Sequence, residues 1–339
     1  MRSMLALASF LLIAASGLLP GPASERSQAA VAFLASLPEP QRESATVVFE
    51  DGERVRWNFV PGQYRGVSFA DLGEESRSTL DALLDAHLSP TGLAEVSAIR
   101  GLEAVLFERE SRPGRPANHR DPERYFLAVF GEPGGEEPWG WRMQGHHLSM
   151  NFTQVGSQPP SFTPFFRGAN PLDSGDAPGA LVAEVEAARA LVASLGTAEL
   201  ERARIAERVP RDVSLGPGQD PTPDEVQGVL VADLDREARA LFLTLMDTFL
   251  DDFDADIVEP LRRRMGGDHV NGFRFAWVGS LEVGEEFGFH VYGDGFTIEA
   301  STPRGQPDHL HWVWRDATDE FGRGLIARHL EAHHEGDDR

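Results

Sequence analysis

The sequence repeats itself, and this repetition is the strongest constraint on its fold. Three blocks of the N-terminal half recur in the same order in the C-terminal half: AVAFLASL (30–37) with ARALVASL (188–195), GVSFADLGEESRSTLDALLDAHL (66–88) with GVLVADLDREARALFLTLMDTFL (228–250), and YFLAVFGEPGGEEPWGWRMQGHHLSMNFT (125–153) with FRFAWVGSLEVGEEFGFHVYGDGFTIEAS (273–301). The copies lie roughly 150–160 residues apart, which is far longer than a solenoid repeat. We therefore expect two similar halves, each the size of a domain.

Both halves have the same expected order of elements. An amphipathic helix (28–37; 182–195) precedes a turn in which Asp71 or Asp233 begins a second helix, and a third helical piece follows. Extended segments then alternate apolar and polar residues, at 125–130, 139–153, 273–278 and 287–300. Helices followed by strands are typical of an α+β fold.

We accordingly predict an internally duplicated α+β protein with two helix-then-strand halves. Their antiparallel sheets would pack side by side or face to face about a pseudo-twofold axis, and two separate lobes are the alternative. The expected boundaries are residues 24–168 for the first half, 169–179 for a Pro- and Gly-containing linker, and 180–335 for the second half.

Residues 1–23 are typical of a signal peptide. Arg2 precedes an apolar run from Leu5 to Leu19, and small residues around Ala23 offer a cleavage site. An uncleaved anchor is the alternative, but the run is short for a span of about 20 residues and a Pro-Gly-Pro break follows it. We expect an exported protein, periplasmic or extracellular, with no stable membrane insertion after the leader is removed.

The composition excludes several chemistries. The chain has no cysteine, which rules out disulfides, cysteine nucleophiles and thiolate metal sites. It also has no lysine, because all 31 basic residues are arginine, and this rules out a Walker A lysine and a pyridoxal Schiff base. A net charge of −23 argues against nucleic acid as a partner, since phosphate backbones repel such a chain.

Two adjacent histidines lie within the extended segment 139–153. Strand alternation puts His146 on the apolar face and His147 on the polar face. We expect His146 to turn into the core and His147 to face a cleft beside Asn151. The second copy has Asp294 and Gly295 at these two positions, so the fold alone does not require the histidine pair.

The second half has histidines of its own in DHLHWVWRD (308–316). His309 and His311 would share one face of a strand, an arrangement that offers a metal two nitrogen ligands. The first half has serine and threonine at the corresponding places. If the halves abut, His147, His309 and His311 would form one composite site, and we predict that it holds one divalent metal ion, possibly zinc.

Two further residues complete the predicted site. Glu299 would act as general base or fourth ligand, and Arg315 would steady an anionic substrate. His146 and Asn151 are secondary candidates. A groove in which the histidines only form hydrogen bonds, without a metal, is the alternative.

These residues favour a metal-dependent hydrolase acting on a small-molecule or unknown substrate. The sequence has no G-x-S-x-G elbow and no G-x-G-x-x-G opening a helix. One rival is a non-catalytic periplasmic or secreted protein that binds a metal or small ligand in the same cleft. Another is a copper or iron redox site, because these metals accept the same ligands.

The motifs GHHLSMNF and HLHWVWRDATDEFG also carry a resemblance. Further motifs of the same kind are Asp71–Leu72, Ala276–Gly279 and Gly293–Glu299. With these motifs the sequence resembles the exported proteins grouped as domain of unknown function family 3500. The resemblance covers nearly all of the chain beyond the leader. It implies export and this architecture, and it implies no reaction.

Overall fold

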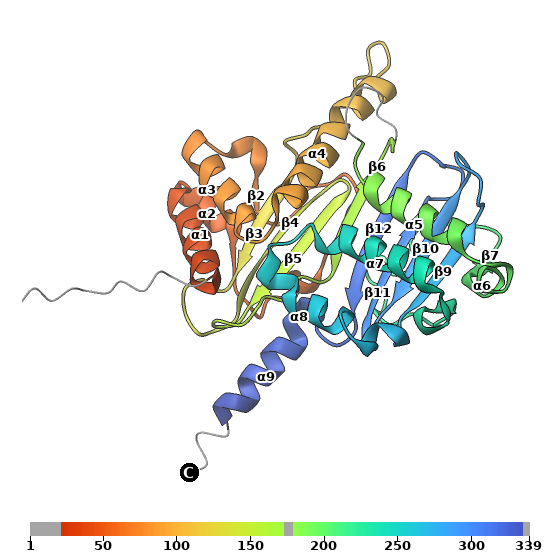
Figure 1. The fold of residues 1–339 in the computed structure, drawn as a ribbon. Coiled ribbons are helices and arrows are strands. Elements are labelled where there is room, and N and C mark those ends of the chain that lie inside the picture. Colours follow the sequence, from red (N-terminus) through yellow and green to blue (C-terminus); the bar gives the residue numbers. More distant parts are fainter. Residues whose placement is uncertain (1–21, 173–178, 335–339) are drawn as a thin grey trace, which may run out of the picture.

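The protein has a mixed α+β fold in which helices pack against one large mixed sheet (Figure 1). This computed structural model describes residues 22–172 and 179–334. The helices are α1 Pro22–Ser36, α2 Glu39–Ala45, α3 Glu74–Asp85, α4 Pro90–Glu110, α5 Val182–Ser194, α6 Thr197–Ala203, α7 Arg236–Leu250, α8 Ala255–Met265 and α9 Arg323–His334. The strands are β1 Thr46–Val47, β2 Val67–Ser68, β3 Phe126–Phe130, β4 Trp139–Gly145, β5 Leu148–Gln154, β6 Phe165–Ala169, β7 Arg204–Ala206, β8 Val229–Leu230, β9 Arg274–Gly279, β10 Phe287–Tyr292, β11 Phe296–Ser301 and β12 Leu310–Asp316.

The strands form one sheet in the order β1-β3-β4-β5-β6-β12-β11-β10-β9-β7, with β2 and β8 pairing at β3 and β9. Neighbours are antiparallel, except that β1 is parallel to β3 and β7 is parallel to β9. In the middle, β6 pairs antiparallel with β12, with Gly168 opposite His311. The strands of the two sequence halves therefore lie side by side in a single sheet, and they do not stack face to face.

The helices cover one face of this sheet, as Figure 1 shows for α4, α5 and α7. Alternate residues of the two central strands, such as Phe165, Trp312 and Trp314, point into this helical core. The helices α3 and α7 each carry apolar residues at helical spacing, and these residues pack into the same core from the helix side. Leu83 of α3 and Phe249 of α7 are fully buried there. The core expected from the helix and strand periodicities is therefore confirmed.

Loops cover the opposite face. Phe166 and Val313 of the central strands pack there against Trp57, Phe59, Val213 and Leu215 from two irregular segments. The polar residues of β5 on this face, Ser149, Asn151 and Thr153, are also buried. Strand alternation predicted their face correctly, but the face is covered and does not line a cleft.

Both predicted helix starts are displaced. Asp71 and Asp233 each end a short 3-10 turn, Phe69–Asp71 and Val231–Asp233. The α7 helix begins after Asp235, whose carboxylate accepts a hydrogen bond from the backbone amide of Ala238. A carboxylate in this cap position satisfies an amide that has no partner within the helix.

The predicted signal peptide lies almost wholly outside the described residues, and the middle of the predicted linker is also outside them. No helix in the described part of the chain has the length and apolar character needed to cross a membrane.

Candidate metal centre

The two adjacent histidines form a turn and are not part of a strand. Gly145, at the end of β4, pairs with Leu148, at the start of β5, so His146 and His147 are the two residues of a tight hairpin turn. The prediction that segment 139–153 runs as one extended strand is therefore wrong. The other copy carried the signal, because its Gly293-Asp294-Gly295 is a typical turn sequence.

The turn holds His147 in an unusual backbone conformation. Its φ angle is +63°, in the left-handed region that glycine occupies readily and other residues rarely. For an ordinary L-residue this conformation costs about 1–2 kcal/mol. The corresponding residue of the other hairpin is Gly295, with φ +87°. A histidine at such a place indicates that its side chain has a use that outweighs the strain.

The turn is fixed to its surroundings by backbone hydrogen bonds. The His147 amide donates to the Phe59 carbonyl over 2.9 Å, and the His147 carbonyl accepts from the Gly168 amide over 2.8 Å. Gly168 lies in β6, directly opposite His311 of β12. These bonds place the His147 ring at the seam where the two central strands meet.

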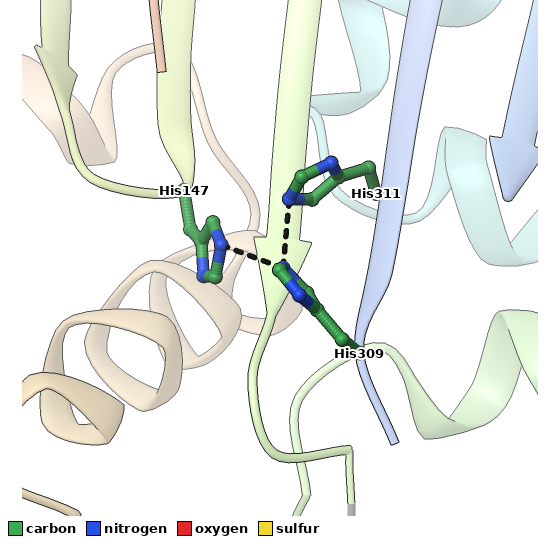
Figure 2. Close-up of side chains that lie close together, drawn as sticks. All are labelled: His147, His309 and His311. Atoms are coloured by element: carbon green, nitrogen blue, oxygen red, sulfur yellow. Dashed lines mark hydrogen bonds between the residues drawn. The ribbon is translucent and has the colours of Figure 1, made fainter. Parts of the chain in front are cut away.

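His309 and His311 reach the same place from the other side of β6. His311 lies in β12, and His309 is the residue directly before the start of this strand. Leu310, between the two histidines, points into the helical core. The prediction that these two histidines share one face is confirmed. Figure 2 shows both rings directed toward His147 in front of β6.

The three rings converge through their Nε2 atoms. The Nε2 of His309 lies 2.9 Å from that of His147 and 2.8 Å from that of His311 (Figure 2). One ring nitrogen from each residue lies within 4.8 Å of the other two, so the group can hold a metal ion. His147 and His311 are buried, and His309 is half-buried. The predicted meeting of histidines from the two sequence halves is confirmed.

A glycine makes room for this convergence. A Cβ atom on Gly168 would lie 2.9 Å from Cδ2 of both His147 and His311, closer than nonbonded carbon atoms approach. The absence of a side chain at this one position of β6 thus lets the two rings flank the strand.

The outer nitrogens of two rings bind acceptors. Nδ1 of His311 lies 2.7 Å from Oδ1 of Asp212, and Nδ1 of His309 lies 3.0 Å from Oε1 of Gln306. With the proton on Nδ1, each ring donates these bonds and, when neutral, presents a lone pair at Nε2. Two lone pairs facing each other at 2.8 Å repel unless a cation lies near both. A carboxylate or carbonyl behind a ligating histidine is typical of metal centres.

The surroundings also favour the neutral form of two of the rings, those of His147 and His309. Burial lowers the pKa of His147 well below its ordinary value, and the charges of His146, His311 and His309 lower it further. Burial likewise lowers the pKa of His309 to about 3, with a further contribution from His311. Neutral imidazole is the form that binds metal.

His146 does not enter the apolar core beside Leu148 as predicted. It is half-buried on the turn, where its Nδ1 contacts the carboxylate of Glu103 and its ring lies beside the Arg120 guanidinium. Its ring stacks on that of His147, with centroids 3.7 Å apart. His146 therefore supports His147 from behind and does not join the converging nitrogens.

Glu299 is not among the residues that converge. It is fully buried on β11, and its two oxygens accept hydrogen bonds from the Ser214 amide, the Ser214 hydroxyl and the Leu215 amide at 2.8–2.9 Å. The structure thus engages Glu299 in holding the loop that carries Asp212.

Arg315 holds the same loop. Its guanidinium is buried, forms an ion pair with Glu320, and donates to the carbonyls of Leu215, Gly216 and Gln219. Asn151 donates to the Pro164 carbonyl over 2.7 Å beneath the loops. The structure gives Arg315 and Asn151 these partners within the fold, away from the ring nitrogens.

A shallow hollow of about 580 Å³ connects the histidines to solvent. His309 and His311 line it together with residues of two loops: Pro210, Arg211, Asp212, Val213, Ser214, Pro303, Arg304 and Gln306. All of these residues belong to the second half, so the hollow is not the cleft between the two halves that the sequence predicted. Sequence reasoning missed Asp212, Gln306 and the two arginines, because they follow no strand or helix period.

The comparison with protein families agrees with this architecture. The model of the family described as "Protein of unknown function (DUF3500)" matches residues 21–323. The chain belongs to the DUF3500 family. This membership confirms the resemblance seen in the motifs, and the match includes all three histidines of the centre. No curated protein and no solved structure matches the chain.

Proposed function

We propose that this DUF3500 protein is an exported, metal-dependent hydrolase whose divalent ion, zinc for preference, is held by His147, His309 and His311. The observation that carries the proposal is the convergence of three Nε2 atoms, two of them with their Nδ1 atoms on acceptors, beside a hollow open to solvent. Three histidines and one open position are the donor set of catalytic zinc sites.

The open position supports a reaction with water. If His147, His309 and His311 held a zinc ion, the ion would supply water with a pKa lowered to about 7, and no carboxylate base would be needed. This matters because Glu299 is engaged with the loop. Asp212 orients His311 and raises the basicity of its Nε2.

A binding protein without turnover is the second candidate. The observation that favours it is that Glu299 and Arg315 are both engaged within the fold, which leaves neither free to act on a substrate. The same histidines would then bind a metal ion or a metal-held ligand for storage or transfer.

Elemental analysis of the purified protein tests both candidates. One equivalent of zinc, lost in His309→Ala together with hydrolysis of activated esters or phosphodiesters, supports the hydrolase. Zinc without hydrolysis favours the binding protein, and copper or iron favours redox chemistry. Wild-type protein that takes up no metal at neutral pH contradicts the proposal.

We infer further that the two halves arose by duplication and are related by a pseudo-twofold axis between β6 and β12. In support, β1 and β2 flank β3 as β7 and β8 flank β9, and the antiparallel central pair has the direction such an axis requires. The two hairpin turns, with Gly145 and Gly293 directly before them, support the same inference. Gly295 and Ser161 then occupy the positions that correspond to His147 and His309, so the symmetry-related place carries neither histidine.

The proposal of export rests on the leader and on the resemblance to exported proteins. N-terminal sequencing of protein recovered outside the cytoplasm should begin near Ser24. A sequence beginning at Met1 in a membrane fraction contradicts this proposal.

A further inference from the structure

Two arginines stand at the solvent side of the hollow. Arg211 and Arg304 both line it, and both are exposed. A backbone hydrogen bond of 3.3 Å from the Arg304 amide to the Arg211 carbonyl joins their loops. The two arginines therefore occupy adjacent backbone positions, and both line the hollow together with His309 and His311.

Neither arginine is neutralised by the fold. Arg304 donates from Nε and Nη2 to the Val209 carbonyl at 3.2 and 2.9 Å, a neutral acceptor that fixes the guanidinium and leaves its charge. Within the described residues, neither Arg211 nor Arg304 forms an ion pair with a carboxylate. In a chain of 54 acidic and 31 basic residues, carboxylates are the more abundant partners, so two unpaired arginines in one place are notable.

The lining of the hollow carries a positive charge. Asp212 is its one carboxylate, and Asp212 is bound to His311. Two guanidinium charges thus face one carboxylate charge, and a bound metal ion would add further positive charge.

We propose that the hollow binds a small substrate through an oxyanion group, a carboxylate or a phosphate, that Arg211 and Arg304 grip while its reacting atom faces the histidines. This inference rests on the proposed metal centre and names its substrate class. Guanidinium groups match the planar edge of both oxyanions and bind them with two parallel hydrogen bonds. The volume of about 580 Å³ is that of a small-molecule site.

The two arginines are specificity residues in this assignment. They contact the anionic group of the substrate and not the bond that reacts. An oxyanion held by both should bind much more weakly when both charges are removed, and the metal should bind as before because neither arginine touches a histidine nitrogen.

The test is isothermal titration of zinc-loaded protein with inorganic phosphate and, separately, with acetate. The double variant Arg211→Gln/Arg304→Gln should weaken binding of the preferred anion at least tenfold and keep one equivalent of zinc. Arg208→Gln is the matched control, because Arg208 is exposed in the same segment and does not line the hollow. Phosphate bound more tightly than acetate points to a phosphate-bearing substrate, and the reverse points to a carboxylate.

Equal affinity of the double variant and the wild type for both anions would overturn the inference. Absence of zinc from the wild type would instead contradict the proposed function. The same comparison in metal-free protein then still decides whether the arginines bind an oxyanion, so the two failures are distinguishable.

Discussion

A single methyl group at Gly168 should disable the metal centre. In Gly168→Ala the new Cβ would lie 2.9 Å from Cδ2 of both His147 and His311. Ordinary contact between carbon atoms begins near 3.5 Å, so each ring must retreat by about 0.5 Å or more. The rings flank the strand, and they would retreat in opposite directions.

This retreat is large on the scale of metal coordination. Metal–ligand distances in working sites vary by only about 0.2 Å. Spreading two of three ligands should therefore weaken metal affinity by about 10- to 100-fold, the range seen when the support of a ligand is removed. This loss corresponds to about 1.4–2.8 kcal/mol of binding free energy. Overpacking should lower the free energy of unfolding by about 1–3 kcal/mol.

Competition for zinc against a coloured chelator measures the affinity, and urea unfolding measures the stability. Gly101→Ala is the matched control, because a Cβ at that position of α4 meets nothing within 4 Å. It should bind zinc as the wild type does and gain about 0.5–1 kcal/mol of stability from helix propensity. Wild-type zinc affinity in Gly168→Ala would refute the reasoning that this glycine sets the spacing of the rings.

Three further outcomes are expected. Asp212→Asn should weaken zinc affinity by about 10- to 100-fold because it removes the negative charge behind His311, whereas the exposed control Asp224→Asn should not. Zinc at 100 times its dissociation constant should raise the free energy of unfolding by about 2.7 kcal/mol, seen as a higher melting temperature, and chelation should reverse this rise. Burial, followed by the charges of Asp252 and Glu95, raises the pKa of Glu184 to about 8. Between about pH 4.5 and 8 the folded chain therefore keeps a proton on Glu184 that the unfolded chain loses. The free energy of unfolding should fall as the pH rises through this range. Urea midpoints of Glu184→Gln should show a flatter pH dependence than those of the wild type or of exposed Glu186→Gln, and parallel slopes would contradict this assignment.

The periodic parts of the sequence predicted their structure well. Leu310, Trp312 and Trp314 alternate with His309 and His311, and this alternation alone placed both histidines on one face. The recurrence of three sequence blocks led to a centre shared by the two halves. In both cases the prediction followed from a side-chain period that the strand geometry enforces.

The rest depended on loops. Alternation puts Glu299 on the face opposite the core, but it says nothing of what covers that face, and the Ser214–Leu215 backbone does so. Asp212 reaches His311 across 99 residues of sequence from a segment without periodicity, so no local pattern announces it. The alternation rule predicted that His147 points away from the apolar core. The direction of its side chain is set instead by a tight turn, to which the rule does not apply.

The turn that carries His147 and the pairing of β6 with β12 have a consequence for the stability of the protein. A chain without cysteine cannot be stapled by disulfides, but an ion shared by His147 and His309 would cross-link positions 162 residues apart. A cross-link that closes so long a loop removes about 4–5 kcal/mol of chain entropy from the unfolded state. Loss of the ion would remove this stabilisation. We would then expect local unfolding, and cleavage by proteases, to begin where β6 and β12 join the two halves.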